Sequence, residues 1–265
     1  MTWQEEMLLD RYGISPADLV RGGLHCEPEA IQPDVVLLPN WRAEIFEAYV
    51  DNLQTIVPNM VYEVRVGEKR VTLIRAGIGA PQTGDTVLAL GATACRRLIF
   101  AGSAGSLRLK VEIGDLVVPA CSLSGDGFTR YLDPTLPPED TFFQPAYPNS
   151  ELTAALLVIS QERGQRAEVK VHSGLIFSTD SIVGQLPFAE EAEQEYDCIA
   201  IEMETAATFA AARRVGIAAA AILAISDSLP EKKTILNRDP EATNRYRQVR
   251  ASVLAPIVID LLAKG

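Results

Sequence analysis

Five short apolar runs rich in β-branched residues constrain the fold of this chain more than any other feature. They cover residues 35–38, 71–74, 98–101, 116–118 and 218–225. Apolar runs of this length without polar alternation are typical of strands buried on both faces. Helical stretches separate them, so the sequence predicts an α/β fold, a three-layer α/β/α arrangement around a central mixed, twisted sheet.

Two of the intervening helices can be placed by their capping residues. Thr83 or Asp85 can cap a helix that continues to Cys95. Ser150 can cap a second helix, which Gly164 is expected to end.

The remaining part of the chain predicts a closing helix and a long loop. The helix begins near Thr243 and is expected to kink at Pro256. Five prolines between residues 133 and 150 predict a loop that acts as a lid or as an oligomer contact. With 265 residues and no internal repeat, we expect a single domain over residues 1–265.

The charge balance excludes several classes of partner. Lys and Arg number 24 against 35 Asp and Glu, and a net charge of -11 argues against binding to nucleic acid or to an anionic membrane. The longest apolar run is too short to span a bilayer, and the first residues lack a signal-peptide pattern. Four widely spaced cysteines indicate reduced thiols, and two histidines are too few to suggest a metal site. We therefore expect a cytoplasmic protein without a metal.

Two glycine-containing loops directly follow predicted strands. Gly77 and Gly79 permit a sharp turn close to a ligand, and Ser103 offers a hydroxyl where a small anion could bind. A tight strand-to-helix turn explains each loop equally well. A dinucleotide-binding loop would need glycine where Gln82 stands, so an NAD-dependent dehydrogenase has little support.

Two carboxylates stand close together after residues 199–201. Alternation along an extended segment puts Glu202 and Glu204 on one face. A single carboxylate can accept hydrogen bonds from both vicinal hydroxyls of a ribose. For Glu202, stabilisation of the following helix N-terminus is an equally good explanation.

A further acid, Asp227, ends the last apolar run together with Ser226. Ligands bind at the carboxyl ends of strands in open α/β sheets, and burial there raises the pKa of a carboxyl group. A protonated acid could donate to a leaving group. Capping of the turn that follows is the alternative role for Asp227.

Taken together, these segments resemble the nucleoside phosphorylase superfamily, which includes hexameric purine nucleoside phosphorylases, uridine phosphorylases and methylthioadenosine/S-adenosylhomocysteine nucleosidases. The resemblance covers about residues 33–238. The matching segments are residues 34–39, 77–81, 102–105, 111–118, 177–180, 202–204 and 226–227.

The resemblance implies a role for each candidate residue. Glu202, Met203 and Glu204 would bind the ribose, with Glu204 on its hydroxyls, while Asp227 and Ser226 would contact the purine and Asp227 would protonate it. The phosphate site would use Ser103, Arg42 and Gly79. His25 of a neighbouring subunit would complete the ribose site, and Arg238 would assist Asp227.

For the base, the resemblance favours a purine, because uridine phosphorylases lack the acid that matches Asp227. Uridine phosphorylases read uracil with a glutamine and an arginine two positions later, whereas Gln185 is followed here by leucine and proline. Ile182 replaces a phenylalanine that stacks on the base in many relatives. Phe177 or an aromatic residue of the loop is expected to stack instead.

Departures from the family pattern bear on the second substrate. Phosphorylases carry an arginine where this chain has Phe100, and their second-subunit arginine is missing near Val57. Arg75 or Arg130 could replace these cations. Nucleosidases carry a water-activating glutamate where Arg42 stands. Because that base is absent, we expect phosphorolysis rather than hydrolysis.

The sequence thus predicts a nucleoside phosphorylase, a pentosyltransferase that cleaves a purine nucleoside with phosphate as co-substrate and without a cofactor. The expected assembly is a homo-oligomer between a dimer and a hexamer. The alternatives are a hydrolytic nucleosidase, an enzyme with uridine phosphorylase-like pyrimidine specificity, and a non-catalytic nucleoside sensor.

Overall fold

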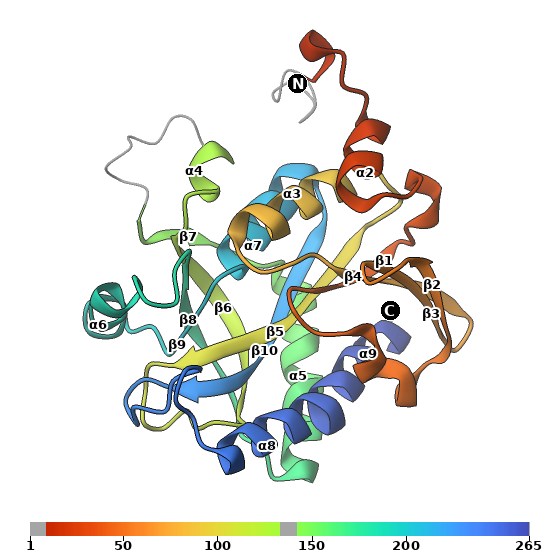
Figure 1. Cartoon of the computed structure of the whole chain (residues 1–265). Helices are drawn as coiled ribbons and strands as arrows, with labels where there is room; N and C mark the ends of the chain where they lie inside the picture. The colour runs from red at the N-terminus through yellow and green to blue at the C-terminus, as the bar shows by residue number, and fades with distance from the viewer. Residues whose placement is uncertain (1–8, 133–141, 265) are drawn as a thin grey trace.

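All five predicted strands are present in the computed structural model, which describes residues 9–132 and 142–264. They lie in one ten-stranded mixed sheet (Figure 1). The strands at the predicted positions are β1 (Asp34–Leu38), β4 (Lys69–Arg75), β5 (Arg97–Ser106), β6 (Leu116–Gly125) and β10 (Ala218–Ser228). Their side chains are almost all buried, as continuous apolar runs predict.

The long strand β5 organises the sheet. It pairs in parallel with β10 along its length, while its first half pairs with β1 and its last residues pair with β9 (Ala200–Glu202). β8 (Val171–Thr179) lies between β9 and β6, and β6 pairs with β10. The strands β5, β9, β8, β6 and β10 therefore form a closed ring, from which β1 is excluded. The ends of β5, β9 and β10 meet at one place.

Five strands lie outside the predicted apolar runs: β8 and β9, described above, and three others that extend the sheet. β3 (Val61–Val66) and β2 (Asp51–Val57) continue it from β4 in antiparallel order, and β7 (Gln144–Ala146) pairs with β6. β2 is largely exposed, so it has no continuous apolar run by which the sequence could predict it.

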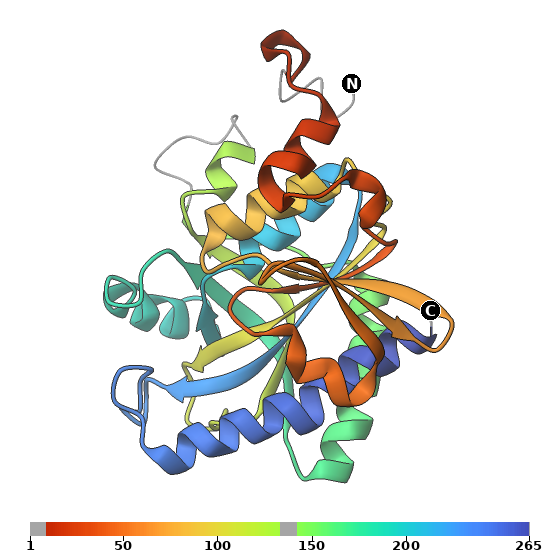
Figure 2. The ribbon, with the colours of Figure 1, turned by 45° about the vertical axis from the view of Figure 1, so that its right-hand side comes forward.

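Helices cover both faces of the sheet, which confirms the predicted three layers (Figures 1 and 2). One face carries α2 (Pro16–Leu24), α3 (Ala80–Leu90) and α7 (Thr205–Val215), and the other carries α5 (Ser150–Ala167), α8 (Pro240–Val249) and α9 (Ala255–Lys264). Further helical segments are η1 (Asp10–Tyr12), η2 (Pro28–Ala30), η3 (Ala43–Tyr49), α4 (Thr129–Leu132) and α6 (Leu186–Gln194). No helix in the described ranges is both long and apolar enough to cross a membrane.

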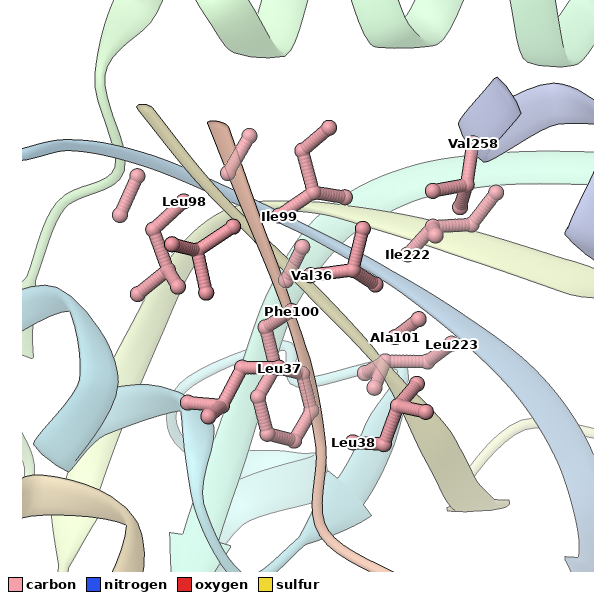
Figure 3. Packing of buried hydrophobic residues seen from close by; sticks show 14 of the residues in the cluster. Val36, Leu37, Leu38, Leu98, Ile99, Phe100, Ala101, Ile222, Leu223 and Val258 are labelled. Carbon is pink, nitrogen blue, oxygen red and sulfur yellow. The ribbon is translucent and has the colours of Figure 1, made fainter. Parts of the chain in front are cut away.

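Side chains of β1, β5 and β10 form the centre of the core (Figure 3). Val36 pairs with Ile99, and Ile222 lies on the same side of the sheet, close to Val258 of α9. Phe100 pairs with Leu37 on the opposite side and is fully buried. Burial of such a side chain stabilises the fold by about 1.5–3 kcal/mol.

The start and end of α3 differ from the prediction. The helix begins at Ala80, with Gly79 at its N-cap and Pro81 in its first turn, so neither Thr83 nor Asp85 caps it. Proline suits this first turn because its missing N–H would have no helical partner there. The helix ends at Leu90, and the predicted extension to Cys95 is wrong.

The prediction for α5 is wrong at both ends. Asn149 caps the helix, because its side chain accepts a hydrogen bond from the Leu152 N–H at 2.9 Å. Gly164 does not end the helix. It lies inside, where a Cβ would stand 2.6 Å from the carbonyl oxygen of Val169, so close packing explains this glycine.

The last helical region begins and bends differently from the prediction. Asp239 caps α8 by accepting the Ala242 N–H at 2.7 Å, so Thr243 lies inside the first turn. The irregularity expected at Pro256 is a π-helical segment, Arg250–Leu254, just before it. A proline has no N–H for the preceding turn, and this favours a local change of helical hydrogen bonding upstream.

Part of the predicted long loop, residues 133–141, lies outside the described residues. The part that follows is ordered around aromatic rings. Phe143 stacks on Tyr196 with a centroid distance of 4.2 Å and on Phe177 at 4.8 Å.

Candidate active site

One cleft lies where the ends of β5, β9 and β10 meet. It brings together eight of the predicted site residues: Ser103, Ile182, Gln185, Glu202, Met203, Glu204, Ser226 and Asp227. Residues that are more than 120 positions apart in sequence thus line one cavity.

The register of the strands explains why the acids meet. Gly105 of β5 pairs with Asp227 on one side and with Ile201 on the other. A Cβ at Gly105 would stand 2.8 Å from Oδ2 of Asp227, so glycine is needed for the close approach of this carboxyl group.

Asp227 has the environment of a proton donor. Its side chain is buried, and the Ser226 hydroxyl donates to Oδ1 at 2.5 Å. Burial raises the pKa of Asp227, while the hydrogen bond from Ser226 and the charge of Arg238 oppose this rise. The carboxyl group therefore holds a proton at a higher pH than an exposed aspartic acid does.

Arg238 lies beside this acid, although it does not line the cleft. Its Nη1 donates to the carbonyl oxygen of Ser226 at 2.7 Å. The predicted proximity of Arg238 to Asp227 agrees with this placement, because its charge acts on that carboxyl group.

Glu202 is held by the N-terminus of α7. Its Oε2 accepts the N–H groups of Glu204 at 2.7 Å and Thr205 at 2.8 Å. Its Oε1 accepts the hydroxyl groups of Thr205, at 2.6 Å, and of Ser178. Four donors leave little capacity for a sugar hydroxyl, so the geometry favours the helix-stabilising explanation for Glu202.

Glu204 makes a different set of contacts. Its Oε1 accepts the N–H of Gly79 at 2.7 Å, and Gly79 adopts a φ of 99°, which favours glycine. Burial and the neighbouring Glu202 raise the pKa of Glu204 to about 8. Burial also raises the pKa of Glu202, and its four hydrogen-bond donors oppose this rise. The predicted phosphate contact of Gly79 has to compete with the carboxyl group of Glu204.

The predicted phosphate side of the cleft contains Ser103 but no cation. Arg42 is exposed at the N-cap of η3, and it does not line the cleft. No arginine or lysine lines the cleft within residues 9–132 and 142–264. Arg75 has a buried Nε without a hydrogen-bond partner, and Arg130 is exposed on α4.

On the predicted base side, Ile182 and Gln185 line the cleft, whereas Phe177 does not. Phe177 is fully buried and stacked on Phe143, so its position contradicts the prediction that it stacks on a base. His25 is exposed at the C-cap of α2 and lines no part of this cleft, so its predicted role requires a neighbouring subunit.

Seven lining residues were not predicted as site residues: Pro39, Asn40, Ile78, Ala104, Gly105, Ile201 and Ile235. Ile78 stands between two glycines of a predicted ligand loop, and 51% of its side chain is exposed. An isoleucine between two glycines of a ligand loop could have been predicted from the sequence as a residue that lines the cleft. Ile235 reaches the cleft only through tertiary structure and has no local signal. Within the described ranges, no cluster of three His, Cys, Asp or Glu residues could hold a metal ion.

The chain is similar in sequence to known proteins. A sequence profile of the phosphorylase superfamily matches residues 35–259. A guanosine phosphorylase from Halorubrum lacusprofundi is 26% identical over 201 residues, which cover 74% of this chain and 79% of that protein. A DeoD-type purine nucleoside phosphorylase from Mycoplasma genitalium is 25% identical over 237 residues, covering 87% and 93%.

A solved structure shows the same fold. Uridine phosphorylase from Vibrio fischeri superposes with a TM-score of 0.74 and 20% identity, covering 89% of this chain and 94% of that one. The family profile spans most of the sheet, both helical layers and the cleft. The chain therefore belongs to the phosphorylase superfamily, a family of nucleoside phosphorylases and nucleosidases.

Proposed function

We propose that this protein is a nucleoside phosphorylase that cleaves the N-glycosidic bond of a purine nucleoside with phosphate, giving the free base and ribose 1-phosphate. This reaction is that of a pentosyltransferase. The observation that carries the proposal is the buried carboxyl group of Asp227, whose pKa is raised, in the same cleft as Glu204.

In the proposed reaction, Asp227 gives its proton to N7 of the purine as the bond from the sugar to the base breaks. The bonding electron pair leaves with the base, and the sugar acquires oxocarbenium character. Glu204 holds the ribose hydroxyls, and a phosphate oxygen near Ser103 forms the new bond to the sugar. A proton from phosphate or solvent then restores Asp227.

The acids of the cleft support phosphate over water as the second substrate. Among the described lining residues, the carboxyl groups are those of Glu202, Glu204 and Asp227. Glu202 is held by four donors, and the proposal assigns the other two to the ribose and the base. No further carboxylate of the described lining is available to activate water.

One observation favours a second candidate, the hydrolytic nucleosidase. Phosphate carries two negative charges, but the described lining provides no arginine or lysine to neutralise them. Under the proposal, Arg42, Arg75 or a residue of another subunit supplies this charge. We propose a homo-oligomer in the cytoplasm, in which His25 reaches the ribose of a neighbouring cleft.

The experiment is a product assay with inosine, guanosine, adenosine and uridine, each with and without phosphate. Chromatography separates free base, ribose and ribose 1-phosphate. We expect base and ribose 1-phosphate from at least one purine nucleoside, only when phosphate is present. Equal release of base and free ribose without phosphate would establish hydrolysis, and faster cleavage of uridine would overturn the purine assignment. Binding without cleavage of any nucleoside would indicate a sensor.

A further inference from the structure

Two arginines and two aromatic rings form a continuous stack beside the cleft. The Arg238 guanidinium lies 5.2 Å from the centre of the Tyr246 ring. The Arg250 guanidinium lies 5.6 Å from the same ring and 5.3 Å from the ring of Trp41. We call Arg238, Tyr246, Arg250 and Trp41 the stacked column.

A hydrogen bond closes this column. Nε1 of Trp41 donates to the Tyr246 hydroxyl oxygen at 3.0 Å, and both side chains are buried. Trp41 comes from the turn after β1 and Tyr246 comes from α8, so the bond joins segments 205 residues apart.

The column ends on two sides of the cleft. At one end, Arg238 donates to the carbonyl oxygen of Ser226, next to Asp227, and Ile235 of the same segment lines the cleft. At the other end, Trp41 directly follows Asn40, which also lines the cleft. Tyr246 stands between these ends and does not line the cleft itself.

We propose that Tyr246 is a positioning residue for the reaction: its ring holds Arg238 against the Asp227 end of the cleft, and its hydroxyl accepts the hydrogen bond that ties the ring to the Asn40–Trp41 turn. The proposal rests on the proposed function, in which Asp227 protonates the base. Tyr246 therefore links the base side of the cleft to the side where phosphate is expected.

The physical basis is the restriction of a flexible cation. An arginine over a buried ring is held more tightly than an arginine surrounded by water. Arg238 is the charged group that acts on Asp227, and it opposes the rise in pKa caused by burial. Glu202 and Glu204 are the other acids of the cleft. Release of Arg238 weakens this opposition, so the pKa of Asp227 should rise further.

The test compares Tyr246→Leu, which removes the ring, with Tyr246→Phe, which keeps it. Tyr246→Leu should lower kcat about tenfold with little change in KM, and it should move the basic limb of the kcat profile to higher pH. Tyr246→Phe should keep most of the kcat of the parent, because it retains the ring. Val249→Ala, a truncation of another buried residue of α8, controls for lost packing and should move neither kcat nor the limb.

A double variant separates positioning from general damage. If Tyr246 acts through Arg238, adding Tyr246→Leu to the Arg238→Ala variant should lower kcat by less than about twofold. A full additional tenfold loss in the double variant would overturn the proposal. So would an unmoved pH limb in Tyr246→Leu, or an equal shift in Val249→Ala.

Binding of a purine base distinguishes failure of this proposal from failure of the proposed function. If the parent protein cleaves no nucleoside, the proposed function fails. The affinity for adenine, measured by calorimetry across pH, then reports Asp227 directly. A higher midpoint in Tyr246→Leu than in the parent and in Val249→Ala supports the positioning role, and an unchanged midpoint overturns it.

Discussion

The two sides of the cleft are built in different ways. On the proposed base and ribose side, Asp227 is buried near the end of β10 and Glu204 is buried at the N-cap of α7, and each has hydrogen-bond partners within the chain. On the proposed phosphate side, Ser103 stands without a cation among the described lining residues, and Arg42 is exposed.

This difference shows which side chains of the cleft have positions set by strand pairing. Strand pairing places Asp227 opposite Gly105, and burial then sets the protonation of the acid. An exposed arginine can change its position at little cost, because water solvates it everywhere. The sheet therefore fixes the acid side, whereas a phosphate site, as proposed, would need exposed side chains such as Arg42 or a residue of another subunit.

The largest expected effect concerns the acid side. Asp227→Asn keeps the size of the side chain but removes the proton donor, so kcat should fall about 10²–10⁴-fold with purine nucleosides. Steady-state kinetics measure this fall. Asp197→Asn, at an exposed aspartate outside the cleft, serves as the control and should behave as the parent. Parent-like turnover by Asp227→Asn would remove this acid from the mechanism.

The second expected effect is a stability difference that depends on pH. The pKa of Glu204 is raised to about 8 in the folded protein, so folding favours its protonated form. This contribution is fully present below the unfolded pKa and is lost as pH rises through about 8.

Glu204→Gln, which stays neutral, should therefore match the parent near pH 4 and exceed its free energy of unfolding by about 5 kcal/mol at pH 9. Denaturant unfolding at both pH values measures the difference. A constant difference across pH would mean that Glu204 is ionised throughout.

The third effect tests the close approach of Asp227 to β5. Gly105→Ala places a Cβ against Oδ2 of Asp227 and should lower kcat about tenfold by displacing the carboxyl group. Gly22→Ala on α2 is the matched control, because its Cβ would meet no atom within 4 Å. Unchanged turnover in Gly105→Ala would show that the site tolerates a shifted acid.

The smallest effects concern the phosphate side. Ser103→Ala should raise the KM for phosphate about tenfold, because it removes one hydrogen bond to a charged ligand. Arg42→Ala should raise this KM less than threefold if the side chain stays in water, as expected for an exposed charge. Kinetics at varied phosphate concentration measure both values. A larger effect of Arg42→Ala would show that the turn after β1 brings this arginine to the phosphate.

Much of the candidate site could be predicted from local sequence patterns. Glu204 and Asp227 end buried apolar segments, and Ser103 follows one, so alternation and strand ends placed all three at a common edge. Phe177 was misjudged because an aromatic residue near a predicted site can either face the ligand or fill the core. The ring of Phe143 packs on it in the folded chain.

Boundaries of helices were less predictable. Thr83 and Asp85 are suitable caps in isolation, yet Gly79 and Pro81 begin α3 instead. Glycine is a typical residue at the end of a helix, but Gly164 lies inside α5. Glycine is needed there because the backbone of Val169 packs closely against it. Several residues can serve as local signals, and tertiary packing selects among them.

By itself, the sequence determined the buried strands, the layer class and the acids that end two of these strands. The strands, the layers and the positions of the acids follow from the order and the periodicity of apolar and polar residues, which are local properties of the sequence. Only the tertiary structure decided that β5, β9, β8, β6 and β10 close a ring, that burial beside Glu202 raises the pKa of Glu204, and that Tyr246 stands between Arg238 and Trp41. Pairing register, burial and contacts between distant segments arise only when the whole chain packs, so no local pattern contains them.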